Sequence, residues 1–475
     1  MKFLREDVAE EEEEEFLPWL PPIPIAGADQ DGKSVIRNRV WRLAAPAIGI
    51  SGSEALAQVI DAAMVARLGT SALAALAPSG LVLLIPITVG IGALVAVTSL
   101  VAKCLGARNP MRAGPFAWGG VVFALAFGLL CLGLFPLAPG IFNLFGNPAH
   151  IIDLEIDYFR VGLFGIGPFL VGAAISNFFV GISRPFQGFT GSLVFLLANV
   201  FFNYLLIFGK LGCPELGFAG AAWGGVAASW AYCVFMLAKL LFPRWRRLGT
   251  TEFAAIPLAF RQILPLGIPM GLAAASEIIA WNVTVTWLVG LYGEKDLAAA
   301  SILLRFLHLS YLPGIGVGVA VTALVAEASG AGRPGRARLI AAISARSLSA
   351  AMIGYGLIVI LSHRWLLPRL SDDPQVIHLI TASLGAFMVI QLFDGLGIVY
   401  GDALRGVGDS TWASWAGFLL CSIVLIGGGI TVAFRFPELG SPAIWMVDAF
   451  HVALASLIFW ARWRSGKWVG ESPME

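Results

Sequence analysis

Long apolar runs fill the chain from about residue 43 to residue 463, and only short polar breaks interrupt them. A helix needs ~20 apolar residues to cross about 30 Å of hydrocarbon. The strands of a membrane barrel would instead alternate polar and apolar residues over ~10 positions, and this sequence has no such pattern. The runs predict an all-α polytopic membrane protein with twelve transmembrane helices, at residues 43–67, 75–104, 114–138, 157–181, 190–210, 217–242, 262–291, 298–329, 337–361, 375–404, 412–434 and 441–463.

The composition excludes several other classes of protein. Of the 475 residues, 58% are apolar and only 13% are charged, whereas soluble proteins carry ~25% charged residues. A soluble enzyme and a disordered scaffold are therefore ruled out. The formal net charge of +1 gives no field to attract DNA, so we expect no nucleic-acid partner. The five cysteines have no metal-binding spacing, and we expect buried, unreactive thiols.

The two ends of the chain differ from its centre. Residues 1–34 hold six consecutive glutamates at positions 10–15 and then clustered prolines, so we expect a disordered cytoplasmic tail. The sequence from 462 is polar, and residues 464–475 are predicted to form a second cytoplasmic tail. Lys and Arg number 21 in the loops on one side of the predicted spans and seven on the other. This excess predicts that both termini face the cytoplasm, in the plasma (inner) membrane.

An internal repeat divides the chain into two halves. Residues 90–110 and 314–334 are identical at 13 of 21 positions, with an offset of 224. The repeat predicts two pseudo-symmetric six-helix bundles, one over residues 35–243 and one over residues 244–463. Parallel repeats of this kind are typical of transporters, in which the substrate path follows the interface between the repeats.

Polar residues stand inside the predicted spans of the first half. A charge at the bilayer centre costs ~2.5–3.5 kcal/mol, so each one calls for a reason. Glu54 and Asp61 are seven residues apart and share one helix face, while Asn199 and Asn203 have helical i,i+4 spacing on another span. If Asp61 faces the two asparagines, the group can hold either a proton or Na⁺. The alternative is that these residues are hydrogen-bonded contacts between helices, and that Glu54 lies near the lipid boundary.

The second half carries its own polar residues. Glu277 and Asp394 lie in different spans, and two adjacent carboxylates can share a proton or be neutralised by a cation. Na⁺ is the metal ion that this pair could bind. Trp281, four residues after Glu277, either faces an organic cation or packs in the core. Arg305 either pairs with these acids or reaches to the outer surface. The five histidines are scattered and lie mostly near the ends of spans, so no catalytic cluster is expected and the chain is not predicted to be an enzyme.

With these residues in place, the sequence resembles the multidrug and toxic compound extrusion (MATE) family of transporters, in its NorM-type branch. The resemblance covers nearly all of residues 37–463. The motifs that support the resemblance are VID at 59–61, LVA at 100–102 before GA at 106–107, NVFFNY at 199–204, PELG at 214–217, Glu277, GAGRP at 330–334, Asp394 and LRGVGD at 404–409.

The resemblance implies a function and a set of sites. It implies two V-shaped bundles and alternating access, with export of organic, often cationic, compounds in exchange for H⁺ or Na⁺. Asp61, Asn199 and Asn203 match the family's cation site in the first half, and Glu277 and Asp394 match its carboxylates in the second. We therefore expect a secondary antiporter with no cofactor besides its coupling ion, with small organic substrates and the lipid bilayer as partners, acting as a monomer.

One alternative remains open at this point. A lipid-linked sugar flippase of the same superfamily would need a larger and more cationic cavity to hold a pyrophosphate. Arg305 is the only central basic residue that the sequence offers to such a cavity. A positive charge at that position would also repel cationic substrates, so it bears on the substrate class of either transporter.

Overall fold

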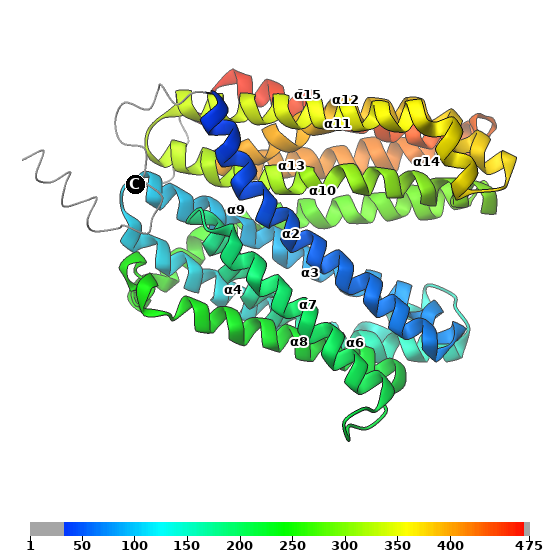
Figure 1. Cartoon of the computed structure of the whole chain (residues 1–475), viewed down its shortest axis with the longest axis horizontal. Coiled ribbons are helices and arrows are strands. Elements are labelled where there is room, and N and C mark those ends of the chain that lie inside the picture. Colours follow the sequence, from blue (N-terminus) through cyan, green and yellow to red (C-terminus); the bar gives the residue numbers. More distant parts are fainter. Residues whose placement is uncertain (1–32, 470–475) are drawn as a thin grey trace, which may run out of the picture.

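The structure, a computed structural model, describes residues 33–469 and consists of helices and short connections (Figure 1). Twelve of its helices are long and apolar enough to cross a membrane, which confirms the predicted number. No strand is present among the described residues. The acidic tail predicted for residues 1–34 lies almost wholly outside the described residues, as do residues 470–475.

The twelve spans fall into two sets of six. In the first half they are α2 (Lys33–Val65), α3 (Thr70–Gly106), α4 (Ala113–Leu132, followed by the short α5, Ala138–Asn143), α6 (Ala149–Gly181), α7 (Pro185–Phe208) and α8 (Gly217–Leu240). In the second half they are α9 (Ile256–Trp281, continued by the π-helical η7, Asn282–Leu288), α10 (Glu294–Gly330), α11 (Pro334–Leu370), α12 (Pro374–Val407), the segment α13–η8–α14 (Ser410–Leu419, Leu420–Gly427 and Gly428–Arg435) and α15 (Ser441–Ser465).

Local sequence explains where several of these helices begin and end. A proline stands at the first position of α7, α11 and α12, where its missing N–H costs no helical hydrogen bond. The Asp373 side chain also caps α12 by accepting a hydrogen bond from the Gln375 backbone N–H at 2.8 Å. Gly209 and Gly408 end α7 and α12 in the left-handed conformation that glycine adopts without strain.

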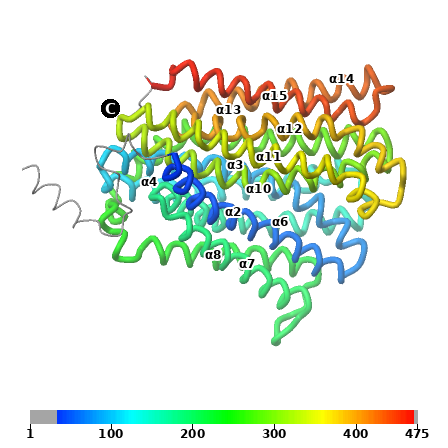
Figure 2. Tube along the Cα trace, turned by 45° about the horizontal axis from the view of Figure 1, so that its top comes forward, coloured from blue at the N-terminus to red at the C-terminus, as the bar shows by residue number. Residues whose placement is uncertain are grey.

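The helices form two lobes that diverge from one end of the molecule (Figures 1 and 2). We call α3, α4, α6, α7 and α8 the N lobe, and α10, α11, α12, the segment α13–η8–α14 and α15 the C lobe. The lobes meet at the end where α15 finishes and spread apart toward the opposite end, with α2 running diagonally across the front of Figure 1. This two-lobe arrangement of twelve helices confirms the predicted fold class.

The first helix of each half is shared between the lobes. The early turns of α2, at Ile36, Val40 and Leu43, are buried in a cluster of C-lobe side chains, whereas its last residue Val65 is buried against N-lobe residues. The early turns of α9 are buried in the N-lobe core, and η7 belongs to a C-lobe cluster. Each of these helices therefore crosses from one lobe to the other, so the lobes in space differ from the halves in sequence.

The repeated sequence forms the crossing of α3 and α10, where the lobes meet. A Cβ atom at Gly106 would lie 2.0 Å from the carbonyl oxygen of Glu327, and one at Gly330 would lie 2.2 Å from the carbonyl oxygen of Lys103. Gly106 and Gly330 are separated by the repeat offset, as are Lys103 and Glu327. Each repeat thus packs its final glycine against the equivalent turn of the other repeat, which gives a physical reason for the repeated residues.

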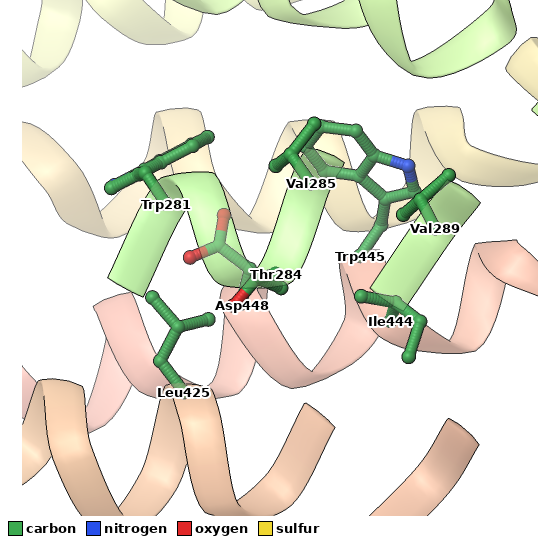
Figure 3. Close-up of a pocket in the computed structure, with 8 residues that line it drawn as sticks. All are labelled: Trp281, Thr284, Val285, Val289, Leu425, Ile444, Trp445 and Asp448. Atoms are coloured by element: carbon green, nitrogen blue, oxygen red, sulfur yellow. The ribbon is translucent and has the colours of Figure 1, made fainter. Parts of the chain in front are cut away.

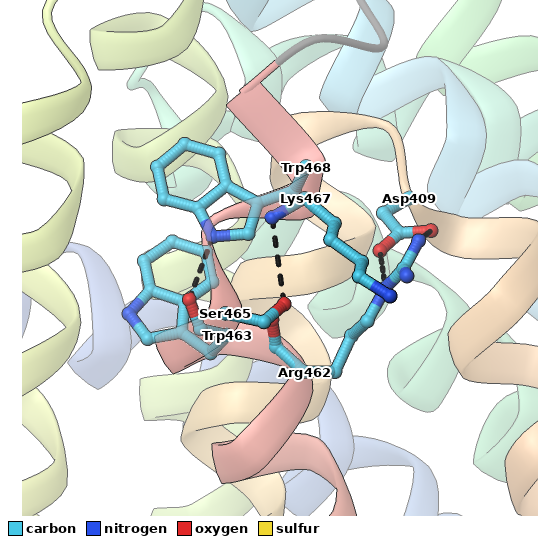
Figure 4. A network of polar contacts seen from close by, with 6 residues as sticks. All are labelled: Asp409, Arg462, Trp463, Ser465, Lys467 and Trp468. Carbon is cyan, nitrogen blue, oxygen red and sulfur yellow. Dashed lines mark hydrogen bonds and ion pairs between the residues drawn. The ribbon is translucent and has the colours of Figure 1, made fainter.

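The C-terminal segment packs more tightly than its polar composition predicts. The helix α15 continues to Ser465, and a short turn then places Trp468 on Trp463, with 4.4 Å between the ring centroids (Figure 4). The Arg462 Nε donates to the Asp409 carboxylate at 2.7 Å, which ties α15 to the start of α13. Residues 462–469, which were expected to begin a polar tail, are therefore packed, because two tryptophans hold this segment against the C lobe.

Candidate ion and substrate sites in the two lobes

The N-lobe candidate site joins α2 to α7. The Asn203 amide nitrogen donates to the Asp61 carboxylate at 2.6 Å and lies 3.4 Å from the Asn199 amide oxygen. Asn199 and Asn203 are buried, whereas Asp61 is half-buried. Tyr158 of α6 also interacts electrostatically with Asp61. The three residues that the sequence proposed for this site therefore lie together, although their role in ion binding stays a prediction.

A close helix contact holds this site in shape. A Cβ atom at Gly224 of α8 would lie only 1.9 Å from the Asn203 amide oxygen, so only glycine leaves room for that side chain. The same oxygen is buried and accepts no hydrogen bond from any residue between 33 and 469. A buried acceptor left without a donor costs about 1–3 kcal/mol. The Asn203 oxygen is therefore free to accept a hydrogen bond or to coordinate a cation beside the Asp61 carboxylate.

The C-lobe candidate site contains Glu277 of α9 and Asp394 of α12. The two carboxylates are half-buried and interact electrostatically, but no hydrogen bond joins them within the described part of the chain. Two nearby carboxylates without a donor between them repel each other unless a proton or a cation neutralises one of them. The pair thus has the chemistry that the sequence predicted for it, and its role is likewise still a prediction.

The structure adds an ion pair that sequence reasoning missed. Arg405, which the charge count assigned to a loop, lies in the last turn of α12 and donates to the Asp402 carboxylate at 2.8 Å. Arg405 also interacts electrostatically with Glu277 and with Tyr311 of α10. The i,i+3 spacing of Asp402 and Arg405 was a signal for this pair, but it was obscured because the predicted helix ended at residue 404.

A second omission is on α15. Asp448 and His451 are buried in the middle of this helix, and both interact electrostatically with Glu277. His451 is therefore one of the histidines that do not lie near the end of a span. An acid and a histidine three residues apart inside an apolar span were the sequence signal that could have identified them.

The remaining predicted residues lie apart from these clusters or at their edges. Trp281 is half-buried and contributes to a small crevice beside Asp448. Glu54 is half-buried, and its electrostatic neighbour is Tyr232 of α8 rather than Asp61. Arg305 is exposed on α10 and makes no ion pair with an acid of the described chain. Of the two alternatives predicted for Arg305, the pairing with the C-half acids is thus not formed within the described residues.

Conventional metal and disulfide sites are not seen in the described part of the chain. No group of three or more His, Cys, Asp or Glu side chains within residues 33–469 is arranged to hold a metal ion. All five cysteines are free, and four of them are buried, as predicted. A Na⁺ ion held by two carboxylates and backbone oxygens would not need such a group, so a Na⁺ ion at Glu277 and Asp394 stays untested.

Comparison with known families identifies the class of protein. The MatE family model matches the chain twice, over residues 46–205 and 269–427, once in each half. The chain belongs to the MatE family. A relative named probable multidrug resistance protein NorM, from Burkholderia mallei, is 28% identical over 89% of this chain and 91% of its own length. A relative of the same name from Rhizobium meliloti is 27% identical over 93% of this chain and 95% of its own length.

Solved structures confirm the fold. A structure described as the outward-facing conformation of a multidrug resistance MATE family transporter of the MOP superfamily superposes with a TM-score of 0.80 at 18% identity, covering 94% of this chain and 99% of that chain. The MatE match and the NorM-named relatives make this chain an integral membrane transporter of the drug and toxin extrusion type, and the relatives are named as multidrug resistance proteins. The resemblance drawn from the sequence is confirmed.

Proposed function

We propose that this MatE protein exports organic compounds, cationic ones among them, in exchange for inward-moving H⁺ or Na⁺. The observation that carries the proposal is that each lobe holds half-buried carboxylates inside apolar helices: Asp61 in one, Glu277 and Asp394 in the other. A cation and a cationic substrate compete for such groups, and competition for shared sites couples their movement.

Alternating access follows from the shape of the molecule. The lobes meet at the end where α15 finishes and diverge at the other end. If that end faces the cytoplasm, as the excess of basic residues there favours, the structure represents an outward-open state. Two contacts from α3 to α12 close the cytoplasmic end: Lys103 donates to the Val407 carbonyl at 2.7 Å, and Ser99 donates to the Arg405 carbonyl at 3.2 Å.

The transport cycle then alternates two occupants of the same carboxylates. In the outward-open state, H⁺ or Na⁺ binds Asp61 or the Glu277–Asp394 pair, and the neutralised carboxylates release their cationic substrate outward. The loaded protein closes outward and opens inward, where the ion leaves and a new substrate binds. The coupling requires only that the two ligands prefer different states of one site.

Efflux from everted membrane vesicles tests this proposal directly. Dye export is driven once by a pH gradient and once by a Na⁺ gradient, in the unaltered protein and in Asp61→Asn, Glu277→Gln and Asp394→Asn. We expect at least one gradient to drive export, and each substitution to reduce that export about tenfold or more, because the neutral side chain no longer exchanges a charge. Glu294→Gln, at an exposed position in the first turn of α10, is the matched control.

Full gradient-driven export by all three variants would contradict the proposal. Export of a pyrophosphate-linked sugar in place of organic cations would favour the flippase alternative, and Arg305→Gln would then reduce transport.

Labelling of single cysteines placed beside residue 467 tests whether this end faces the cytoplasm. We also propose that the protein acts as a monomer in the plasma (inner) membrane, which mass measurement in detergent checks.

A further inference from the structure

The helix α15 carries a buried carboxylate that no hydrogen-bond donor satisfies. Asp448 is 3% exposed, and neither of its carboxylate oxygens has a hydrogen-bond partner within residues 33–469. An ionised carboxylate buried without a partner costs several kcal/mol. Asp448 therefore requires a proton or another cation, and the transport cycle described above does not use it.

Two further unsatisfied polar groups lie beside this carboxylate. The His451 Nδ1 is 3.7 Å from the nearer Asp448 oxygen, which is too far for a hydrogen bond, and it has no other partner in the described chain. The Thr284 hydroxyl is also buried and unpartnered, and with Asp448 it lines a small crevice. Figure 3 shows the Asp448 carboxylate directed between Trp281 and Thr284.

The backbone beside this crevice departs from the regular α-helix. Thr284 and Val285 belong to the π-helical η7, and Leu425 belongs to the π-helical η8, which borders the crevice from the other side. A π-helical turn shifts the backbone hydrogen bonds by one residue and is frequent at functional sites. Two such turns against one buried acid make an arrangement that simple packing does not require.

We propose that Asp448 and His451 together bind one proton and form a proton-binding site distinct from Glu277 and Asp394. Ionised Asp448 and neutral His451 carry one negative charge, and a single proton taken from water brings the pair to zero. The proton resides on the carboxyl group, which lies beside the Thr284 hydroxyl and faces His451 Nδ1 across the 3.7 Å gap. A role for this proton site in transport rests on the proposed antiport function.

Charged and titratable groups surround the pair on three other elements. Glu277 of α9 and Asp394 of α12 both interact electrostatically with Asp448. Cys421 of η8 lies with its sulfur 3.6 Å from the His451 Nε2. When Glu277 and Asp394 are ionised, their charge favours proton binding by Asp448 and His451. The charge of each site therefore changes the proton affinity of the other, although the two sites share no ligand.

Equilibrium proton uptake by the purified full-length chain tests the site without substrate or gradient. Protons bound per chain are counted with a pH indicator as the sample moves from alkaline to mildly acidic pH. We expect Asp448→Asn to bind one proton fewer than the unaltered protein. The double variant Asp448→Asn/His451→Gln should also lose one proton and not two, because the pair holds a single proton. Glu294→Gln should match the unaltered protein.

Unchanged uptake by Asp448→Asn, or a loss of two protons in the double variant, would overturn the proposal. If Asp448→Asn does not fold, infrared difference spectra of the chain labelled with ¹³C-aspartate replace it. The carboxylic acid band that forms on acidification must then shift in Thr284→Val, and a band insensitive to this change is the contrary result. Uptake is measured without transport, so its failure leaves the efflux proposal standing, and the failure of efflux leaves the proton site standing.

Discussion

The polar sites of the two lobes use different chemistry, although each includes a carboxylate on the first helix of its half, Asp61 on α2 and Glu277 on α9. In the N lobe, Asp61 is hydrogen-bonded by the neutral amide of Asn203 at 2.6 Å. In the C lobe, Glu277 and Asp394 have no such amide donor in the described chain, and an ion pair of Asp402 with Arg405 lies beside them. The N-lobe site is thus stabilised by hydrogen bonds, whereas the C-lobe site is governed by charge.

The scaffold around these sites is nearly the same in both halves. A Cβ atom at Gly316 would lie 2.7 Å from the Ala44 carbonyl of α2, and one at Gly92 would lie 2.9 Å from the Gly271 Cα of α9. These crossings are equivalent under the repeat offset. The comparison teaches that duplication preserved the helix crossings, where glycine is sterically required, while the polar residues between the crossings diverged.

The largest expected effect concerns the part of the scaffold that both halves share. Gly106→Val and Gly330→Val each force a side chain into the backbone of the opposing helix, and both should lower stability by at least about 3 kcal/mol. The yield of monodisperse protein in size-exclusion chromatography measures this loss. Gly335→Ala, in open space at the start of α11, should have no effect. A large loss from only one of the two valine variants would show that the crossing is not equivalent in the two halves.

The next effect belongs to the charged C-lobe site. Arg405→Gln removes the partner of Asp402, and because both side chains are partly exposed we expect a loss of about 2 kcal/mol, below that for a fully buried pair. Chemical unfolding in detergent measures it. Adding Asp402→Asn should recover much of the loss, because no carboxylate is then left unpaired. A double variant no more stable than Arg405→Gln alone would argue that the pair does not interact.

A smaller effect is expected in the N lobe. Asn203→Ala removes the donor to Asp61 and should cost about 1–2 kcal/mol in the same unfolding measurement. Asn199→Ala should cost less, since Asn199 is 3.4 Å from its partner. If these two substitutions have the reverse order, the hydrogen bond from Asn203 is not what stabilises this site.

The smallest effect is expected at Glu54. Its electrostatic neighbour is Tyr232, and it lies outside the Asp61 cluster, so Glu54→Gln should change gradient-driven efflux by less than about twofold. Asp61→Asn, measured in the same vesicles, is the contrasting variant. Equal loss of efflux in both variants would place Glu54 in the N-lobe site after all.

The sequence predicted the fold more completely than the site. Apolar runs and a repeated glycine pattern were sufficient for twelve helices in two lobes, because lipid and close helix crossings impose strong, local requirements on residue type. Asp61 was correctly predicted to face Asn199 and Asn203, whose i,i+4 spacing places the two asparagines on one face of α7. Asp402 and Asp448 were missed, since their partners depend on where α12 ends and how α15 rotates, and a sequence of uniformly apolar spans does not specify either.

The sharing of α2 and α9 between the lobes has a consequence for how such a protein can assemble. A half-length chain would leave the early turns of its first helix without a surface to cover them, and it could bury them only by exchanging that helix with a second copy. The full chain therefore has the form of a domain-swapped dimer whose two subunits have been joined end to end. Joining the subunits makes the exchange independent of protein concentration and ensures that neither lobe is complete without the other.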